Sequence, residues 1–156
     1  MDVYGQEYEI EVRVSHHFRG EHALPARPEM HKHLWDVEFS VSGPLNPQTG
    51  MVCDMLILAE FFKPFVAPMD GYNLHEYEDF QDKEGLVGLT ATYPTCDTLA
   101  HYFLWKTIPE FKNDPRFANL RISQIKVSIY EPDKKEAWGH AIIRPKPGNE
   151  SQPGST

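Results

Sequence analysis

Two histidines separated by a single residue, His31 and His33, have the spacing in this sequence that most directly suggests chemistry. In a β-strand, residues i and i+2 project from the same face, about 7 Å apart along the strand, so both imidazoles can bind one ion. A third histidine, His16, ends the apolar face of an earlier alternating segment. Three neutral imidazoles suit zinc and leave a fourth coordination position open, as in catalytic zinc sites. The spacing therefore predicts a zinc site formed by His16, His31 and His33.

Other interpretations of these histidines stay open, because an isolated H-x-H pair is only a weak indication of a metal. Cupins also use H-x-H followed by a glutamate, and Glu38 lies five residues after His33. An odd offset places Glu38 on the opposite face of a continuous strand, so the cupin reading is disfavoured. The other histidines are interpreted as surface or local hydrogen-bonding residues: His17, His22, His75, His101 and His140.

Three further polar residues could contact a ligand. Glu131 extends the apolar face of an alternating segment, where an unpaired carboxylate is costly, and it could bind the guanidine-like edge of a heterocycle. The simpler alternative is that Glu131 opens the turn that follows it. Thr95 and Asp97 are interpreted first as a helix N-cap and a residue favoured by the helix dipole, and alternatively as ligand contacts.

The order of the expected elements indicates an α+β fold. Alternating polarity predicts strands at residues 8–17, 31–42, 122–131 and 136–143. Two helices are expected between the strand pairs, one capped by Asp54 and disturbed near its end by Pro64, the other starting at Thr95 and stopped by Pro109. Paired strands with the helices between them predict a sheet that helices cover on one side.

The rest of the chain sets the domain boundaries. Residues 67–94 are expected to form a long irregular connection, which is usually functional or partly structured. The tail at residues 145–156 has almost nothing apolar to bury, so we expect it to be disordered. Residues 1–144 are therefore expected to form a single domain.

Composition excludes several classes of function. The formal net charge is −8 and no basic run occurs, which argues against binding to nucleic acid phosphates or anionic lipid. The most apolar stretch, residues 51–66, contains three charged residues and is too polar to span a bilayer. Two cysteines and no secretory pattern lead us to expect a cytoplasmic protein.

Several short segments together resemble the 6-pyruvoyl-tetrahydropterin synthase and 6-carboxytetrahydropterin synthase family. They run in order over roughly residues 8–141, which is more specific than any one motif. The segments are Val14-Ser15-His16-His17-Phe18 (like A-A/S-H-R-L), His31-Lys32-His33 (like H-G-H), residues 43–54 (like G-x-I/V-D-P-x-T-G-M-I/V-x-D), Met69-Asp70 with Leu74 (like L-D-H-x-x-L), Pro94-Thr95-Cys96-Asp97 (like P-T-S/A-E) and Ile129-Tyr130-Glu131 (like V-x-E-T).

The resemblance implies a tunnelling fold (T-fold): a four-stranded antiparallel sheet with two helices on one face, in ββααββ order, assembled through sheet edges, usually into a hexamer. It also implies roles for matching residues. The expected metal ligands are His16, His31 and His33, the expected substrate-binding residues are Glu131, Thr95 and Asp97, and the expected cofactor is Zn²⁺.

The sequence departs from the family where protons are transferred. The family's cysteine lies shortly before H-x-H, where this chain has none, and Gly71 follows Asp70 where the family has a histidine. Glu29 is the candidate replacement for the cysteine as general base, and His75 for the lost histidine. The expected catalytic residues are therefore Glu29, Asp70 and His75.

The leading hypothesis is a zinc-dependent lyase that acts on dihydroneopterin triphosphate or a related pterin. The commonest bacterial activity of chains with this resemblance is 6-carboxytetrahydropterin synthase, which feeds deazaguanine and queuosine synthesis. Because two proton-transfer residues are missing, two alternatives stay open: a zinc- and pterin-binding module, and a T-fold enzyme with altered chemistry or substrate.

Overall fold

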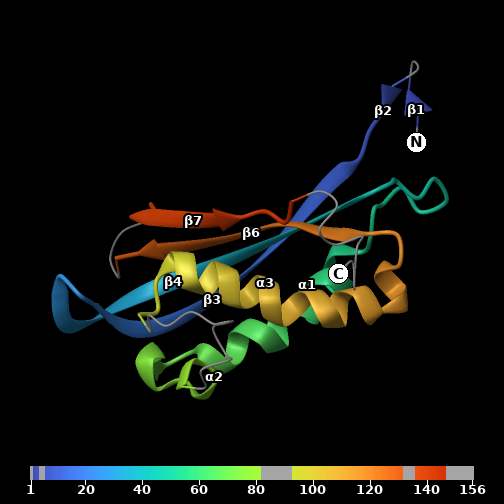
Figure 1. The fold of residues 1–156 in the computed structure, drawn as a ribbon. Helices are drawn as coiled ribbons and strands as arrows, with labels where there is room; N and C mark the ends of the chain where they lie inside the picture. The colour runs from blue at the N-terminus through green and yellow to red at the C-terminus, as the bar shows by residue number, and fades with distance from the viewer. Residues whose placement is uncertain (1, 4–5, 82–92, 132–135, 147–156) are drawn as a thin grey trace, which may run out of the picture.

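Two sheets and three α-helices make up the part of the chain that the structure describes, residues 2–3, 6–81, 93–131 and 136–146 of a computed structural model (Figure 1). The strands are β1 (Asp2–Val3), β2 (Gln6–Glu7), β3 (Ile10–Leu24), β4 (Arg27–Gly43), β5 (Tyr72–Asn73), β6 (Arg121–Tyr130) and β7 (Gly139–Ile143). The helices are α1 (Met55–Val66), α2 (Glu78–Gln81) and α3 (Cys96–Asn113), with short 3₁₀ turns at Ala67–Met69, Leu74–Glu76 and Pro115–Phe117. The expected tail falls mostly outside the described residues, at 147–156.

The main sheet differs from the expected one by one short strand. Its order is β5-β3-β4-β6-β7. The strands β3, β4, β6 and β7 are antiparallel to their neighbours in this group, as predicted. β5 adds a parallel partner at the outer edge of β3, pairing Gly20 with Tyr72 and Glu21 with Asn73. The sheet is therefore mixed and five-stranded. A two-residue strand is too short to show an alternating pattern, which is why the sequence does not predict it.

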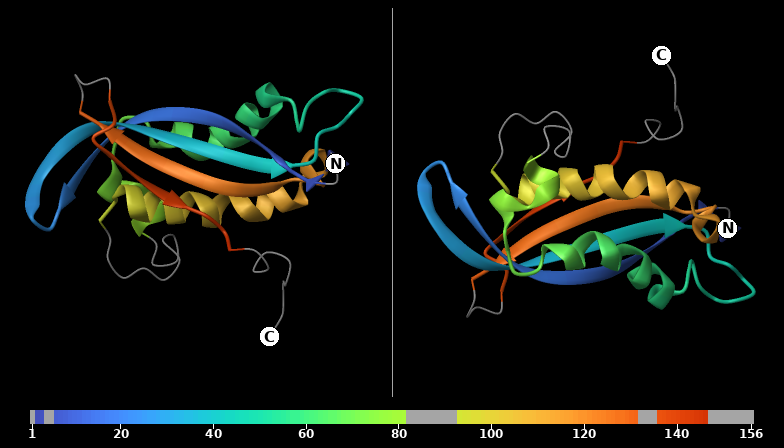
Figure 2. Two further views of the ribbon diagram at one scale, coloured as in Figure 1. Left: turned by 90° about the horizontal axis from the view of Figure 1, so that it is seen from above. Right: turned by 90° about the horizontal axis from the view of Figure 1, so that it is seen from below.

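Both long helices cover the same face of the sheet, as expected (Figures 1 and 2). α1 packs against β3, whereas α3 packs against β6 and β7. Alternate β4 residues from Trp35 to Val41 are fully buried beneath them, and the rings of Phe39 and Phe62 stack at 4.0 Å. None of the helices in the described ranges is long and apolar enough to span a bilayer.

The helix starts agree with the sequence, but one helix end does not. Asp54 Oδ1 accepts a hydrogen bond from the Leu56 amide at 2.9 Å, and Thr95 forms a reciprocal capping box with Thr98. The expectation that Pro109 ends the second helix was wrong, because α3 continues to Asn113. Phe111 is buried beyond the proline and stacks on Phe117, and this burial offsets the backbone bond that proline removes.

The hairpin formed by β3 and β4 is longer than the alternating segments in the sequence. The strands continue to a turn at Pro25 and Ala26, and the hairpin tip projects beyond the rest of the sheet (Figure 2). Pairing of β4 with β6 stops at Leu34 and Tyr130. The base of this projection is where the candidate site lies.

Candidate metal centre

Three histidines converge at the base of the projecting hairpin. They are His22 on β3 and His31 and His33 on β4, and their nearest ring nitrogens all lie within 4.8 Å of one another. The antiparallel register sets this arrangement, because His22 is paired directly with His31, and Gly20 with His33. The ring centroids of the three pairs are 4.4, 5.0 and 4.9 Å apart.

A backbone carbonyl orients each of the three rings. The Nδ1 atoms contact the carbonyl oxygens of Pro94 (from His22, 2.6 Å), Glu29 (from His31, 3.0 Å) and Tyr130 (from His33, 3.2 Å). A carbonyl can only accept a hydrogen bond, so each Nδ1 carries the proton. In the neutral ring this leaves the lone pair on Nε2, the tautomer that a metal ligand requires.

The three Nε2 atoms fit a metal ion better than they fit an apolar core. Each is buried and has no hydrogen-bond partner among the described residues. Buried acceptors without a partner cost free energy, and three of them face one another here. Burial lowers the pKa of His22 to about 4 and also lowers the pKa of His33, so both rings are neutral at neutral pH. The arrangement therefore has the donor set of a three-histidine site with an open fourth position.

His16, the expected third ligand, lies elsewhere and His22 takes its place. His16 is paired with Val37, and its Nε2 lies 2.8 Å from the carbonyl oxygen of Ala59 on α1. His16 and His22 share one face of β3, but six residues of strand separate them by about 20 Å. His22 was interpreted from the sequence as a local residue. Its place in His22-Ala23-Leu24 fits the family's H-R-L pattern better than His16 does, and that was the available signal.

Of the three expected catalytic residues, His75 is the one whose side chain forms a hydrogen bond next to the cluster. Glu29 lies two residues before His31 with its side chain exposed, and its own carbonyl holds the His31 ring. His75 Nε2 accepts a hydrogen bond from the Ala23 amide at 2.9 Å, next to His22. Asp70 is exposed and accepts from the Arg19 amide at 2.8 Å.

Two of the expected substrate-binding residues come in the sequence directly after a residue whose carbonyl oxygen contacts a histidine ring. Glu131 comes directly after Tyr130 and is half-buried. Burial lowers the pKa of His33, and the negative charge of Glu131 partly opposes this lowering. Glu131 therefore lies near the His33 ring. Thr95 comes directly after Pro94, and its hydroxyl caps α3, as the simpler interpretation predicted. Asp97 is exposed in the first turn of α3.

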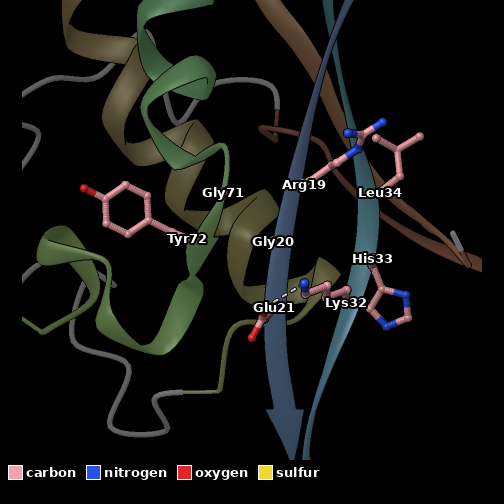
Figure 3. A pocket seen from close by; sticks show the side chains of 8 residues that line it. All are labelled: Arg19, Gly20, Glu21, Lys32, His33, Leu34, Gly71 and Tyr72. Atoms are coloured by element: carbon pink, nitrogen blue, oxygen red, sulfur yellow. Dashed lines mark ion pairs between the residues drawn. The ribbon is translucent and has the colours of Figure 1, made fainter.

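A cavity of about 390 Å³ is lined by residues of β3 and β4, among them His33, and by Gly71 and Tyr72 (Figure 3). Its lining residues are Arg19, Gly20, Glu21, Lys32, His33, Leu34, Gly71 and Tyr72. Glu21 and Lys32 face each other, with 3.6 Å between carboxylate and ammonium. These two residues alternate with Gly20 and His33, so they project from the opposite face of the sheet. The histidines, rather than this cavity, define the candidate site.

Comparison with known proteins gives the same family as the motifs. The profile of the family "6-pyruvoyl tetrahydropterin synthase" matches residues 7–138. No protein with a curated description matches the chain by sequence.

Solved structures of 6-pyruvoyl tetrahydropterin synthases share the fold. The Caenorhabditis elegans enzyme is 17% identical with a TM-score of 0.62, covering 89% of this chain and 97% of its own. The Plasmodium falciparum enzyme is 22% identical with a TM-score of 0.56, covering 88% and 98%. A Plasmodium vivax variant in which a catalytic glutamate is replaced by cysteine is 19% identical with a TM-score of 0.56, again covering 88% and 98%. The family match extends over most of the chain, and the chain belongs to the 6-pyruvoyl tetrahydropterin synthase family.

Proposed function

We propose that this protein is a zinc-dependent lyase that acts on dihydroneopterin triphosphate or a related pterin, with His22, His31 and His33 as the zinc ligands. The observation that carries the proposal is the shared orientation of the three rings, each with Nδ1 bound to a carbonyl and Nε2 turned toward the others. When bound, zinc supplies Lewis-acid polarisation of the oxygens on the substrate side chain.

The residues next to the ligands are suited to bind the pterin ring. Glu131 accepts two hydrogen bonds from the ring N–H and the exocyclic amine in this proposal, as a carboxylate does from a guanidine-like edge. Thr95 and Asp97 contact the same ring from the start of α3. The Pro94 carbonyl supports this placement, because it ties the start of α3 to His22.

Glu29 is the proposed general base. It accepts a proton from the substrate side chain, a role for which a carboxylate near a metal centre is suitable. Its position two residues before His31 and its exposed side chain support this assignment. The Plasmodium vivax protein, which also has a catalytic glutamate, provides a parallel. Asp70 and His75 assist by fixing the backbone at Arg19 and Ala23.

One observation favours a second candidate function, a zinc- and pterin-binding module or an enzyme of altered chemistry. Gly71 stands where the family has a histidine, and its φ of +83° is a conformation that favours glycine. A histidine here would have to adopt that left-handed conformation, so the family's proton-transfer residue is not simply replaced at this position. For either function we propose a cytoplasmic homo-oligomer, a hexamer by family resemblance, in which residues 1–144 form one domain; queuosine synthesis is the proposed pathway for the lyase.

Metal content and turnover, measured on the same preparations, test the proposal. The wild-type protein should contain about one zinc per chain and convert dihydroneopterin triphosphate. Glu29→Gln should retain zinc and lose at least about 100-fold in turnover, the usual contribution of a general base. Glu110→Gln, an exposed glutamate on α3, is the matched control and should change neither.

The other outcomes separate the alternatives. Tight pterin binding without turnover in the wild type would support the binding module. Zinc without any pterin affinity would support a different substrate. A protein that neither contains nor takes up zinc would contradict the proposal.

A further inference from the structure

An exposed tryptophan stands beside the metal centre and plays no part in the site described so far. The Trp138 side chain is 54% exposed, and its ring is nearly parallel to the ring of His33, with 12° between the planes and 6.5 Å between centroids. Its backbone amide donates to the Ile129 carbonyl at 2.7 Å, which fixes where the side chain begins. The exposed Trp138 ring thus lies next to His33, a proposed zinc ligand that is itself only 8% exposed.

A cationic side chain accompanies this ring. The guanidinium carbon of Arg27, at the start of β4, lies 5.3 Å from the Trp138 ring centroid, within the range of a cation–π interaction. Burial is the main cause of the lowered pKa of His33, and the positive charge of Arg27 lowers it further. The guanidinium is therefore near the candidate metal centre as well. The chain therefore places a flat aromatic ring and a positive charge at the same edge of the site.

Trp105 shows that exposure alone does not explain this arrangement. Its side chain on α3 is 40% exposed, and the Lys106 ammonium lies 5.9 Å from its ring. Trp105 has no ring contact with any of the three histidines, whereas Trp138 stacks along His33. Both tryptophans are exposed and both have a neighbouring cation, but of the two only Trp138 has a ring contact with a histidine of the cluster.

We propose that Trp138 and Arg27 form the substrate-specificity element of the metal centre: the indole stacks on a flat heterocycle, and the guanidinium binds an anionic group on the same molecule. This inference rests on the proposed function, because it names the side chains that hold the pterin ring and its triphosphate. Stacking on an indole face accepts any flat heterocycle, whereas the Arg27 charge selects molecules that carry phosphate or carboxylate.

Two probes separate the roles of the two residues. Turnover is measured with dihydroneopterin triphosphate, and equilibrium binding is measured calorimetrically with neopterin, which has the ring but no phosphate. Trp138→Ala should weaken neopterin binding and raise KM by about tenfold, with zinc content unchanged, and Trp138→Phe should recover most of the loss. Arg27→Gln should raise KM for the triphosphate by about tenfold while neopterin binding stays within twofold.

Trp105→Ala is the matched control and should leave both measurements within twofold of the wild type. If Trp138→Ala binds neopterin as tightly as the wild type does, or changes only the oligomeric state, the inference fails while the proposed function stands. If the zinc-loaded wild type binds neither probe, the proposed function fails and takes this inference with it.

Discussion

His22 and His31 lie directly opposite each other on the paired strands β3 and β4, with their ring centroids 4.4 Å apart. Their Nδ1 atoms donate to carbonyls from two different parts of the chain, so their Nε2 lone pairs point into the same buried space. The register of the hairpin therefore determines whether the candidate metal centre can form. A change in register would separate the rings and also move the apolar residues of the same ladder out of the core.

The two candidate third ligands can be separated by mutation. His22→Ala should weaken zinc binding by more than about 100-fold, because even loss of a residue that only orients a ligand costs 10–100-fold. His16→Ala, on the same face of the same strand, should leave zinc affinity within threefold. Zinc competition with a chromophoric chelator measures both. Loss of zinc in His16→Ala with retention in His22→Ala would contradict the site.

The stability of the metal-free protein should fall as the pH is lowered. Burial lowers the pKa of His22 from its ordinary value of 6.5 to about 4, so between these values the unfolded chain binds a proton that the folded chain does not. The free energy of unfolding should therefore decrease by about 2 kcal/mol from pH 7 to pH 5 through this residue alone. Burial of His33 acts in the same direction.

Urea denaturation in the presence of EDTA, at pH 7 and pH 5, measures this loss. His22→Gln removes the titrating group and should show a shallower dependence on pH. Equal dependence in the two proteins would mean that His22 is not a buried neutral imidazole in the metal-free state.

Restoring the family's histidine at position 71 should destabilise the protein. Gly71 has a φ of +83°, and a residue with a side chain pays about 1–2 kcal/mol in that conformation. Gly71→His should therefore lower Tm by roughly 3–6 °C, although a side chain there has open space. Gly139→Ala, also in open space but without a positive φ, should change Tm by less than 2 °C. Calorimetric melting curves of the two variants give the comparison.

Turnover should not depend on either cysteine. Burial raises the pKa of Cys96 to about 12 and also raises the pKa of Cys53, so few thiolates exist near neutral pH. In the native protein Cys96 should resist a thiol reagent at pH 8, and two thiols should react after unfolding in guanidinium. Cys53→Ser should retain activity within about threefold. Complete loss of turnover in that variant, with zinc retained, would assign the missing base to Cys53.

Local patterns were sufficient for most of the fold. Alternation of apolar residues located the four antiparallel strands of the main sheet, although not the full length of the β3–β4 hairpin. The side chains of Asp54 and Thr95 marked the helix starts. Both signals depend on residues only two to four positions apart. The end of α3 could not be predicted in this way. The burial of Phe111 that carries the helix past Pro109 involves Phe117 and the rest of the core.

The candidate metal centre was likewise predictable in part from local patterns and in part only from the folded chain. The spacing of His31 and His33 was enough to predict that two imidazoles share a face, since strand geometry repeats every two residues. The same two-residue repeat places His16 and His22 on one face of β3, so strand geometry alone cannot identify which of them is the third ligand. The fit of His22 to the family's H-R-L pattern favours it, but the spatial choice is made by the paired hairpin. The short turn of this hairpin at Pro25 and Ala26 fixes which β3 residue lies opposite His31. The carbonyls that orient the rings come from β4, β6 and the start of α3, and only the folded chain brings these together.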